Sequence, residues 1–169
     1  LPMVGLTGSV GKTTTKEFIA LVLSAKYNTL KTQGNLNNEI GVPQMLFRLE
    51  DSHTAAVIEM GMNHFGEISR LTRAVAPTVG LITNIGVSHI ENLGSRAGIL
   101  QAKLEILEGM APDAPLIVNM DNDMLRTVKL GDRPLLTFAI DDQSADFTAT
   151  DIAEQGSTTT FTVHHSTFN

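Results

Sequence analysis

The sequence predicts an α/β fold: a mostly parallel sheet with helices on both faces, followed by a small carboxy-terminal β-hairpin. Two observations predict the sheet. Short runs that are apolar throughout alternate with amphipathic segments, as in strands that are buried on both faces. Polar and charged residues follow several of these runs directly, at the strand ends where such sheets bind ligands. A Thr-rich tail with a central turn predicts the hairpin.

The first two elements surround a glycine-rich loop. An apolar strand is predicted at residues 3–7, and a helix is predicted at residues 13–23. Within that helix Phe18, Leu21 and Val22 recur at helical spacing, which predicts an amphipathic segment.

The remaining elements continue the alternation. Strands are predicted at residues 29–32, 55–60, 79–84, 116–119 and 135–140, and helices at residues 43–49, 66–74, 95–110 and 123–129. Pro43 suits a first helical turn, and Pro77 stops the helix before it. Ser95 is the expected amino-terminal cap of the longest helix.

The tail differs in composition from the rest of the chain. Two strands at residues 146–153 and 158–164 flank a turn at residues 155–157. We therefore expect a nucleotide-binding domain at residues 1–142 and a hairpin appendage of the same domain at residues 143–169. The chain begins almost directly on a strand and ends on another, so we expect it to be a piece of a longer protein.

Composition and charge exclude several classes of function. The chain has 169 residues, of which 42% are hydrophobic, enough for one domain with a real core. A net charge of −6 without a basic run argues against nucleic acid as a partner. The lack of cysteine excludes disulfides, thiolate metal sites and Cys nucleophiles, and it fits the cytoplasmic location that we expect. No segment resembles a membrane span or a signal peptide, so no membrane partner is expected.

A phosphate-binding loop is predicted between the first strand and the first helix. Glycines there allow backbone N–H groups to point at phosphate, and the helix amino terminus adds a positive dipole end. The expected ligands of the nucleotide are Gly8, Ser9, Val10, Gly11, Lys12, Thr13 and Thr14. Lys12 would reach the β- and γ-phosphates, and the Thr13 hydroxyl would bind magnesium. The general motif has a glycine where this chain has Leu6, so the match is incomplete.

Three polar residues follow later strands. Glu59 closes its strand and is a candidate ligand for a magnesium ion that bridges ATP phosphates, although a surface Glu is an equal alternative by itself. His89 is a candidate for a metal or phosphate contact, with a structural histidine as the alternative. Asn119 stands where an adenine or ribose contact is plausible.

Lys103 lies in the apolar stripe of its helix, between Ile99 and Ile106. The pattern alone favours a lysine whose amine reaches solvent past its neighbours. The alternative is a buried amine with a lowered pKa, which reacts with carbon dioxide to give a carbamate that binds metal. The loop at residues 34–43 adds Asn37 and Asn38, which suit recognition of a sugar, phosphate or peptide, or simply form turns.

Taken in order, these motifs resemble the central domain of the Mur ligases. The residues that carry the resemblance are 7–15, 34–43, 59–66, 84–95 and 102–106. The loop at residues 34–38 together with residues 59–63 is most similar to the branch that joins D-alanyl-D-alanine to UDP-N-acetylmuramoyl-tripeptide. The phosphate loop of that family also lacks the early glycine, so Leu6 is no obstacle.

The resemblance implies a role for each matching position. Lys12 and the loop around it would bind ATP phosphates, and Lys12, His89 and Lys103 would serve catalysis. Thr13 and Glu59 would hold one magnesium ion, and His89 a second beside a carbamylated Lys103. Asn37 and Asn38 would face the UDP-linked substrate, and Asn119 would lie near adenine.

The implied activity is an ATP-dependent amide ligation in peptidoglycan precursor synthesis, through an acyl phosphate, by a monomer. The family's amino-terminal UDP-binding domain and its carboxy-terminal domain are absent from this chain, so we expect the chain alone to bind nucleotide at most. Three alternatives remain: another Mur ligase, a folylpolyglutamate synthase-like ligase, and a nucleotide-binding module without chemistry. A folylpolyglutamate synthase loop resembles G-K-G-S, whereas this chain has Lys12-Thr13-Thr14.

Overall fold

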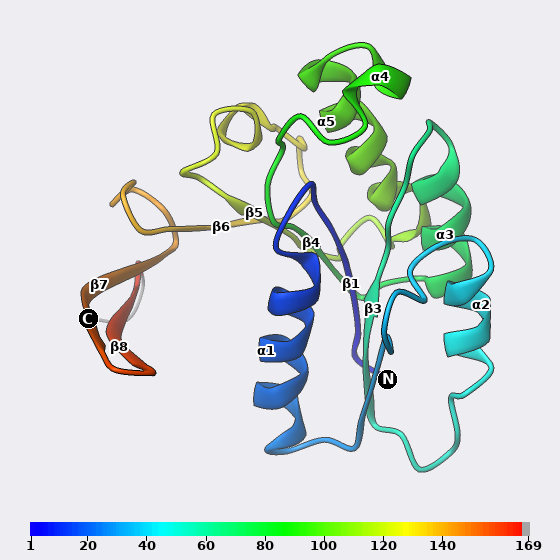
Figure 1. Cartoon of the computed structure of the whole chain (residues 1–169), viewed down its shortest axis with the longest axis horizontal. Helices are drawn as coiled ribbons and strands as arrows, with labels where there is room; N and C mark the ends of the chain where they lie inside the picture. The colour runs from blue at the N-terminus through cyan, green and yellow to red at the C-terminus, as the bar shows by residue number, and fades with distance from the viewer. Residues whose placement is uncertain (167–169) are drawn as a thin grey trace.

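An eight-stranded sheet organises the part of the chain that the computed structural model describes, residues 1–166. The strands are β1 (Met3–Thr7), β2 (Thr29–Lys31), β3 (Ala55–Glu59), β4 (Val79–Ile82), β5 (Leu116–Asn119), β6 (Leu135–Ala139), β7 (Phe147–Gln155) and β8 (Thr158–His165). Their order is β2-β3-β1-β4-β5-β6-β7-β8, and all neighbours are parallel except β7 and β8. The carboxyl ends of the central strands therefore meet at one edge, which is the upper edge in Figure 1.

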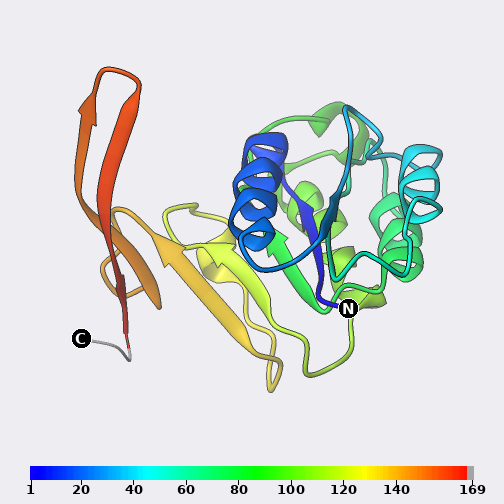
Figure 2. The same ribbon diagram turned by 90° about the horizontal axis from the view of Figure 1, so that it is seen from below.

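Helices cover both faces, as the sequence predicts. They are α1 (Lys12–Ser24), α2 (Gly41–Leu46), α3 (Glu67–Val75), α4 (Ile90–Leu93) and α5 (Arg96–Leu104), with 3-10 turns η1 (Glu105–Gly109) and η2 (Leu125–Thr127). The larger core cluster joins β1, β3, β4 and β5 to α2, α3 and α5, and a smaller cluster lies beneath α1. Figure 2 shows α1 on one side of β1, with α2 and α3 on the other. No helix in residues 1–166 is both long enough and apolar enough to span a membrane.

The predicted hairpin is present and continues the same sheet. The turn between β7 and β8 falls at Gly156, and β7 pairs in parallel with β6 at Phe138 and Ala139. Figure 2 shows the hairpin projecting away from the helices. The last three residues of the predicted appendage, 167–169, lie outside the described residues.

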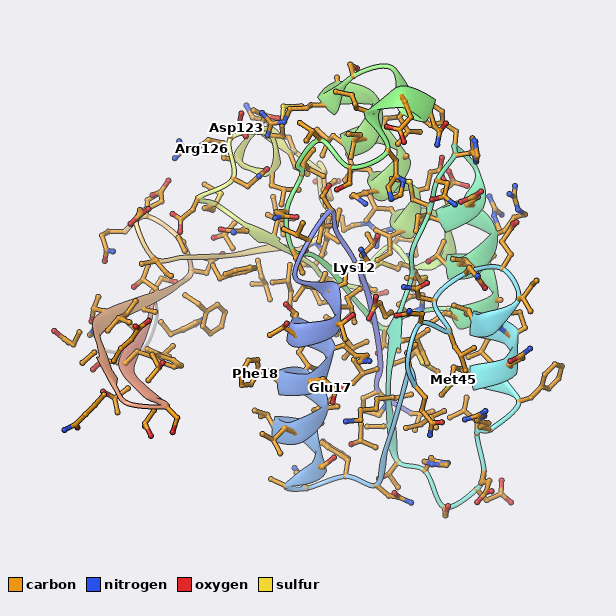
Figure 3. All side chains as sticks on the ribbon, viewed as in Figure 1. Lys12, Glu17, Phe18, Met45, Asp123 and Arg126 are labelled. Atoms are coloured by element: carbon orange, nitrogen blue, oxygen red, sulfur yellow. The ribbon has the colours of Figure 1, made fainter. Side chains whose placement is uncertain are left out.

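The first helix is present, but its apolar stripe faces solvent instead of the sheet. Phe18, Leu21 and Val22 are 64%, 69% and 73% exposed. Figure 3 shows Phe18 projecting from the side of α1 opposite β1. The buried face of α1 instead contains Lys16 and Ala20. Helical spacing alone therefore identified the helix but not the face that packs.

Two helix predictions at the far end of the chain are wrong in extent. The helix predicted at residues 95–110 ends at Leu104 and continues as η1, because the Ile106 carbonyl accepts a hydrogen bond from the Thr72 hydroxyl. Ser95 does cap its start, since the Ser95 side chain accepts the Gly98 N–H.

The helix predicted at residues 123–129 is only the turn η2. The Thr127 hydroxyl donates to the Met124 carbonyl, and such local bonds compete with helical ones. Val128 is already extended. Smaller differences are that α2 begins at Gly41, that β4 ends at Ile82, and that the sequence pattern missed α4.

Candidate functional site

The glycine-rich loop between β1 and α1 has the conformation that its sequence predicts. Gly11 precedes α1 with a φ of 79°, a left-handed conformation that favours glycine. A Cβ added at Gly8 would lie 1.8 Å from the Thr83 hydroxyl oxygen, so only glycine fits there. The loop therefore presents the amino terminus of a 13-residue helix to the upper edge of the sheet.

Residues at the end of β4 hold this loop in place. The Asn84 side-chain oxygen accepts the Ser9 and Val10 N–H groups at 3.1 and 3.0 Å. The Thr83 hydroxyl donates to the Val10 carbonyl at 2.7 Å. This role of Thr83 and Asn84 was not predicted from the sequence pattern, because it depends on contacts between segments more than 70 residues apart. These bonds fix the loop before any ligand arrives.

Replacing Asn84 with alanine should therefore weaken nucleotide binding about tenfold. The Val10 N–H would lose its acceptor, and the Ser9 N–H would keep only the Asn84 backbone carbonyl at 3.1 Å. The loss of two hydrogen bonds, at a typical net value of about 0.5–1.5 kcal/mol each, gives roughly that weakening. Calorimetric titration with magnesium and ATP measures it, and Asn92→Ala on the exposed surface of α4 is the matched control. Equal affinities for the two variants would show that Asn84 does not organise the loop.

The lysine and threonine of the loop face different partners. The Lys12 ammonium donates to the Gly8 carbonyl at 3.0 Å and so folds back over the loop. Figure 3 places Lys12 at the upper end of α1. The Thr13 hydroxyl donates to a Glu59 carboxylate oxygen at 3.1 Å, and both Thr13 and Thr14 are exposed. Lys12 is therefore available to phosphate, and Thr13 points toward a carboxylate.

Glu59 is buried at the end of β3, with 2% of its surface exposed, so the surface alternative is wrong. Its other carboxylate oxygen accepts a hydrogen bond from the Asn37 amide at 2.9 Å. A hydroxyl and a carboxylate that meet beside a phosphate loop are the hard oxygen donors that Mg²⁺ prefers. Among residues 1–166 no group of three or more His, Asp or Glu side chains gathers around a possible metal position. The pair would thus need phosphate oxygens or water to complete a magnesium site.

Lys103 does not reach past its neighbours to bulk solvent, so the interpretation from pattern alone is wrong. The residue is 2% exposed, and its side chain borders a cavity. Burial, together with the nearby Lys12 ammonium, lowers the pKa of Lys103 from 10.5 to about 7. Within residues 1–166 its amine has no hydrogen-bond partner. A large fraction of this amine is therefore neutral and available to react near pH 7.

One cavity of about 220 Å³ brings together six of the thirteen predicted site residues. From the predicted set it is lined by Gly8, Lys12, Asn37, Asn38, His89 and Lys103. His89 enters it from a left-handed backbone position, with a φ of 67°, directly before α4. Thr13 and Glu59 adjoin it through the bond from Asn37 to Glu59. Phosphate-binding, metal-binding and amine groups thus share one space.

The two asparagines are partly committed to other groups. Asn37 donates to Glu59, and the Asn38 side-chain oxygen accepts the Ile40 and Gly41 N–H groups at the start of α2. Asn38 thus forms a turn, which was the alternative to a role in ligand recognition, and its side chain also lines the cavity.

Asn119 is not among the residues that line the cavity. Its side-chain oxygen accepts the Asp121 N–H at 3.0 Å, at the end of β5. A second hollow beside this turn is lined by Asp121, Arg126 and three residues of the β6–β7 loop. Asn119 therefore lies two strands away from the phosphate loop, at the same edge of the sheet.

Glu67 also lines the cavity, although the sequence pattern did not identify it as a site residue. Partial burial acts to raise the pKa of this carboxyl, but hydrogen bonds from the Asn63 N–H and from His64 outweigh burial and hold the pKa below its usual range. The signal available in the sequence was its position directly after Gly66, at the start of a helix. An ionised Glu67 therefore faces Lys103 and Lys12 across one cavity.

Comparison with known proteins identifies relatives from a single family. The family described as the Mur ligase middle domain matches residues 6–169. A UDP-N-acetylmuramoyl-tripeptide--D-alanyl-D-alanine ligase from Synechocystis is 50% identical over 125 residues, which cover 74% of this chain and 28% of the relative. The ligase of the same name from Escherichia coli is 44% identical over 163 residues, which cover 95% of this chain and 36% of the relative. The chain thus spans about a third of the length of the curated relatives that it matches.

Solved structures agree with these relatives. A crystal structure of MurF from Acinetobacter baumannii has a TM-score of 0.90 at 39% identity, and the match covers 98% of this chain and 36% of that one. MurF from Thermotoga maritima in complex with ADP has a TM-score of 0.85 at 31% identity, covering 95% of this chain and 37% of that one. A folylpolyglutamate synthase mutant from L. casei, at 15% identity and a TM-score of 0.67, shares the fold alone.

Proposed function

This chain belongs to the Mur ligase family as a middle domain, and we propose that its full-length protein joins D-alanyl-D-alanine to UDP-N-acetylmuramoyl-tripeptide. The reaction would convert ATP to ADP and phosphate and yield a peptidoglycan precursor. One observation carries the proposal: Lys12, His89 and the unpaired amine of Lys103 line a single cavity beside the Thr13–Glu59 pair. The names of the most similar curated relatives favour this branch over other Mur ligases and over folylpolyglutamate synthase.

ATP would lie with its phosphates on the loop from Gly8 to Thr14. Backbone N–H groups and the amino terminus of α1 would bind the β-phosphate, and Lys12 would swing from the Gly8 carbonyl onto the γ-phosphate. Thr13 and Glu59 fit a magnesium ion because their oxygens already lie 3.1 Å apart. Bound there, magnesium would neutralise phosphate charge. Asn119, at the end of β5, would lie toward the adenine.

The chemistry would proceed in two transfers. The γ-phosphate would pass to the terminal carboxylate of the tripeptide, which gives an acyl phosphate and ADP. The amine of D-alanyl-D-alanine would then attack the acyl carbon, lose a proton, and expel inorganic phosphate. Neither step needs a nucleophilic side chain. Lys12 and its neighbours would act by positioning the reactants and stabilising charge.

Lys103 would act as a carbamate. Its amine is buried, has no hydrogen-bond partner within residues 1–166, and has a pKa near 7, so its neutral form is accessible to carbon dioxide. The N–C bond would form as the nitrogen lone pair attacks the carbon and one amine proton is released. The product would place a negative charge between Lys12 and His89, where a second magnesium ion would be held.

The UDP-linked peptide would approach over Asn37 and Asn38, which border the cavity. The amide oxygen of Asn37 is left for a substrate, because only the amide nitrogen is used by Glu59. We further propose that the full-length protein is a cytoplasmic monomer, as expected from the sequence.

A ligation assay with purified full-length protein tests the proposal. ADP and phosphate should appear only when ATP and both substrates are present, and the peptide product should grow by the mass of D-alanyl-D-alanine less water. The 169-residue chain alone should release no product, because it spans about a third of its relatives. Ligation by the chain alone would contradict the expected need for the other domains. Release of phosphate with other amino acids but not with D-alanyl-D-alanine would reject the proposed branch.

A further inference from the structure

Lys16 is a buried lysine to which the proposed mechanism gives no role. It lies one turn after Lys12 on α1 and is 1% exposed. Its ammonium donates to the Thr32 carbonyl at 2.8 Å and lies 3.1 Å from a carboxylate oxygen of Glu17. Buried ionic groups contribute little net stability compared with a well-packed apolar side chain. A role in orientation explains such a residue better than a role in stability.

Thr32 connects this ammonium to the end of β3. It is fully buried and follows β2 directly, and its N–H donates to the Val57 carbonyl at 3.0 Å. Its hydroxyl accepts the Glu59 N–H at 2.9 Å. Thr32 therefore accepts two hydrogen bonds: its carbonyl accepts one from the Lys16 ammonium, and its hydroxyl accepts one from the Glu59 backbone N–H.

Thr32 is also the first residue of the loop that contains Asn37. That loop returns to the end of β3, since the Gly61 N–H donates to the Asn37 carbonyl at 2.7 Å and the Asn37 amide donates to Glu59. Within residues 1–166, β2 is an edge strand of three residues that pairs with β3 alone, so its strand hydrogen bonds hold the start of this loop weakly. The hydrogen bond from Lys16 to the Thr32 carbonyl connects the start of the loop to α1 as well.

We propose that Lys16 is a positioning residue, which acts through Thr32 to aim the Glu59 carboxylate at Thr13. The inference rests on the proposed function insofar as Glu59 and Thr13 bind magnesium in the ligase. The contacts form one path: Lys16 to Thr32, Thr32 to Glu59, and Glu59 to both Thr13 and Asn37. Loss of partners that orient a metal ligand typically weakens metal binding 10- to 100-fold.

Two variants interrupt the path at different points. Lys16→Met removes the ammonium and keeps an unbranched apolar chain, and Thr32→Val removes only the hydroxyl that accepts the Glu59 N–H. Lys31→Met is the matched control, because the Lys31 ammonium also pairs with Glu17 but is partly exposed and, within residues 1–166, donates no hydrogen bond to Thr32.

The first measurement is Mn²⁺ binding to the 169-residue chain, followed by paramagnetic broadening of the Thr13 and Glu59 amide signals. Lys16→Met and Thr32→Val should each require at least about tenfold more Mn²⁺ than the wild type, and Lys31→Met should match the wild type. Wild-type affinity in Thr32→Val overturns the proposal, even where Lys16→Met does not fold. The absence of broadening in the wild type overturns it too.

The second measurement separates this inference from the proposed function. In the full-length ligase both variants should need about tenfold more Mg²⁺ for half-maximal rate, and high Mg²⁺ should restore kcat, which a misfolded variant would not allow. A wild type that binds Mn²⁺ but does not ligate would reject the ligase activity and leave the positioning role standing. Rates that no Mg²⁺ concentration restores would assign Lys16 to folding alone.

Discussion

Replacing Lys103 with methionine should stabilise the fold at pH 7 while it abolishes ligation by the full-length protein. The pKa of Lys103 is about 7 in the folded chain against an ordinary value of 10.5. Between these values the unfolded chain binds more protons, so stability falls as the pH drops from about 10.5 toward 7 and is not recovered below 7. The difference corresponds to at most about 5 kcal/mol, and methionine, which carries no charge, should recover part of it.

Denaturant unfolding of the 169-residue chain at pH 7 and at pH 10 measures this effect. The wild type should be more stable at the higher pH, and Lys103→Met should lose most of that difference. Lys129→Met, at an exposed position, controls for the general effect of removing a positive charge. A destabilised Lys103→Met at pH 7 would mean that the amine stabilises the fold, contrary to its unpaired position.

The same substitution should reduce ligation by about hundredfold or more, because the negative charge proposed between Lys12 and His89 would be lost. A ¹³C carbamate signal from labelled bicarbonate should appear in the wild type above a pH of about 7, where the amine is neutral, and be absent from Lys103→Met. Unchanged ligation by the variant would remove the carbamate from the mechanism. If both expectations hold, removal of Lys103 raises stability and lowers activity, which is the trade-off expected where a functional group is kept at a cost in stability.

The fold followed from the sequence because strands that are buried on both faces and punctuated by glycine leave few alternatives to a parallel sheet. The packing of α1 did not follow. Its apolar stripe at Phe18 and Val22 is exposed, while its buried face includes Lys16, a residue that hydrophobic spacing assigns to the surface. Periodicity locates a helix, but which stripe is buried depends on partners that the local sequence does not specify.

The candidate site shows the same division. The positions of Lys12, Thr13 and Glu59 at one edge of the sheet could be predicted, since each stands at a strand end or in a loop directly after a strand. The burial of Lys103 did not follow from the pattern, because a lysine in an apolar stripe usually reaches solvent, and only the family resemblance favoured a buried amine. Asn84 went unassigned because its role consists of contacts with a loop 74 and 75 residues away. Such contacts leave no periodic signal.

Replacing Lys12 with alanine should weaken binding of ATP and magnesium by the 169-residue chain about ten- to hundredfold. A hydrogen bond to a charged group contributes about 1.5–3 kcal/mol, and no other side chain of the loop carries a positive charge. Calorimetric titration of Lys12→Ala beside Lys129→Ala separates a contact with phosphate from a general loss of charge. Equal binding by wild type and Lys12→Ala would place the phosphates elsewhere.

The Lys12 substitution should also change Lys103, and this second effect tests whether the two amines share one cavity in solution. The Lys12 ammonium contributes to the lowered pKa of Lys103, so the pKa of Lys103 should rise in Lys12→Ala, although burial still keeps it below 10.5. The proposed carbamate should consequently appear at a higher pH in Lys12→Ala than in the wild type, even without nucleotide. An unchanged pH for that signal would mean that the two amines do not interact, and the cavity would then not bring the phosphate loop and the modified lysine together.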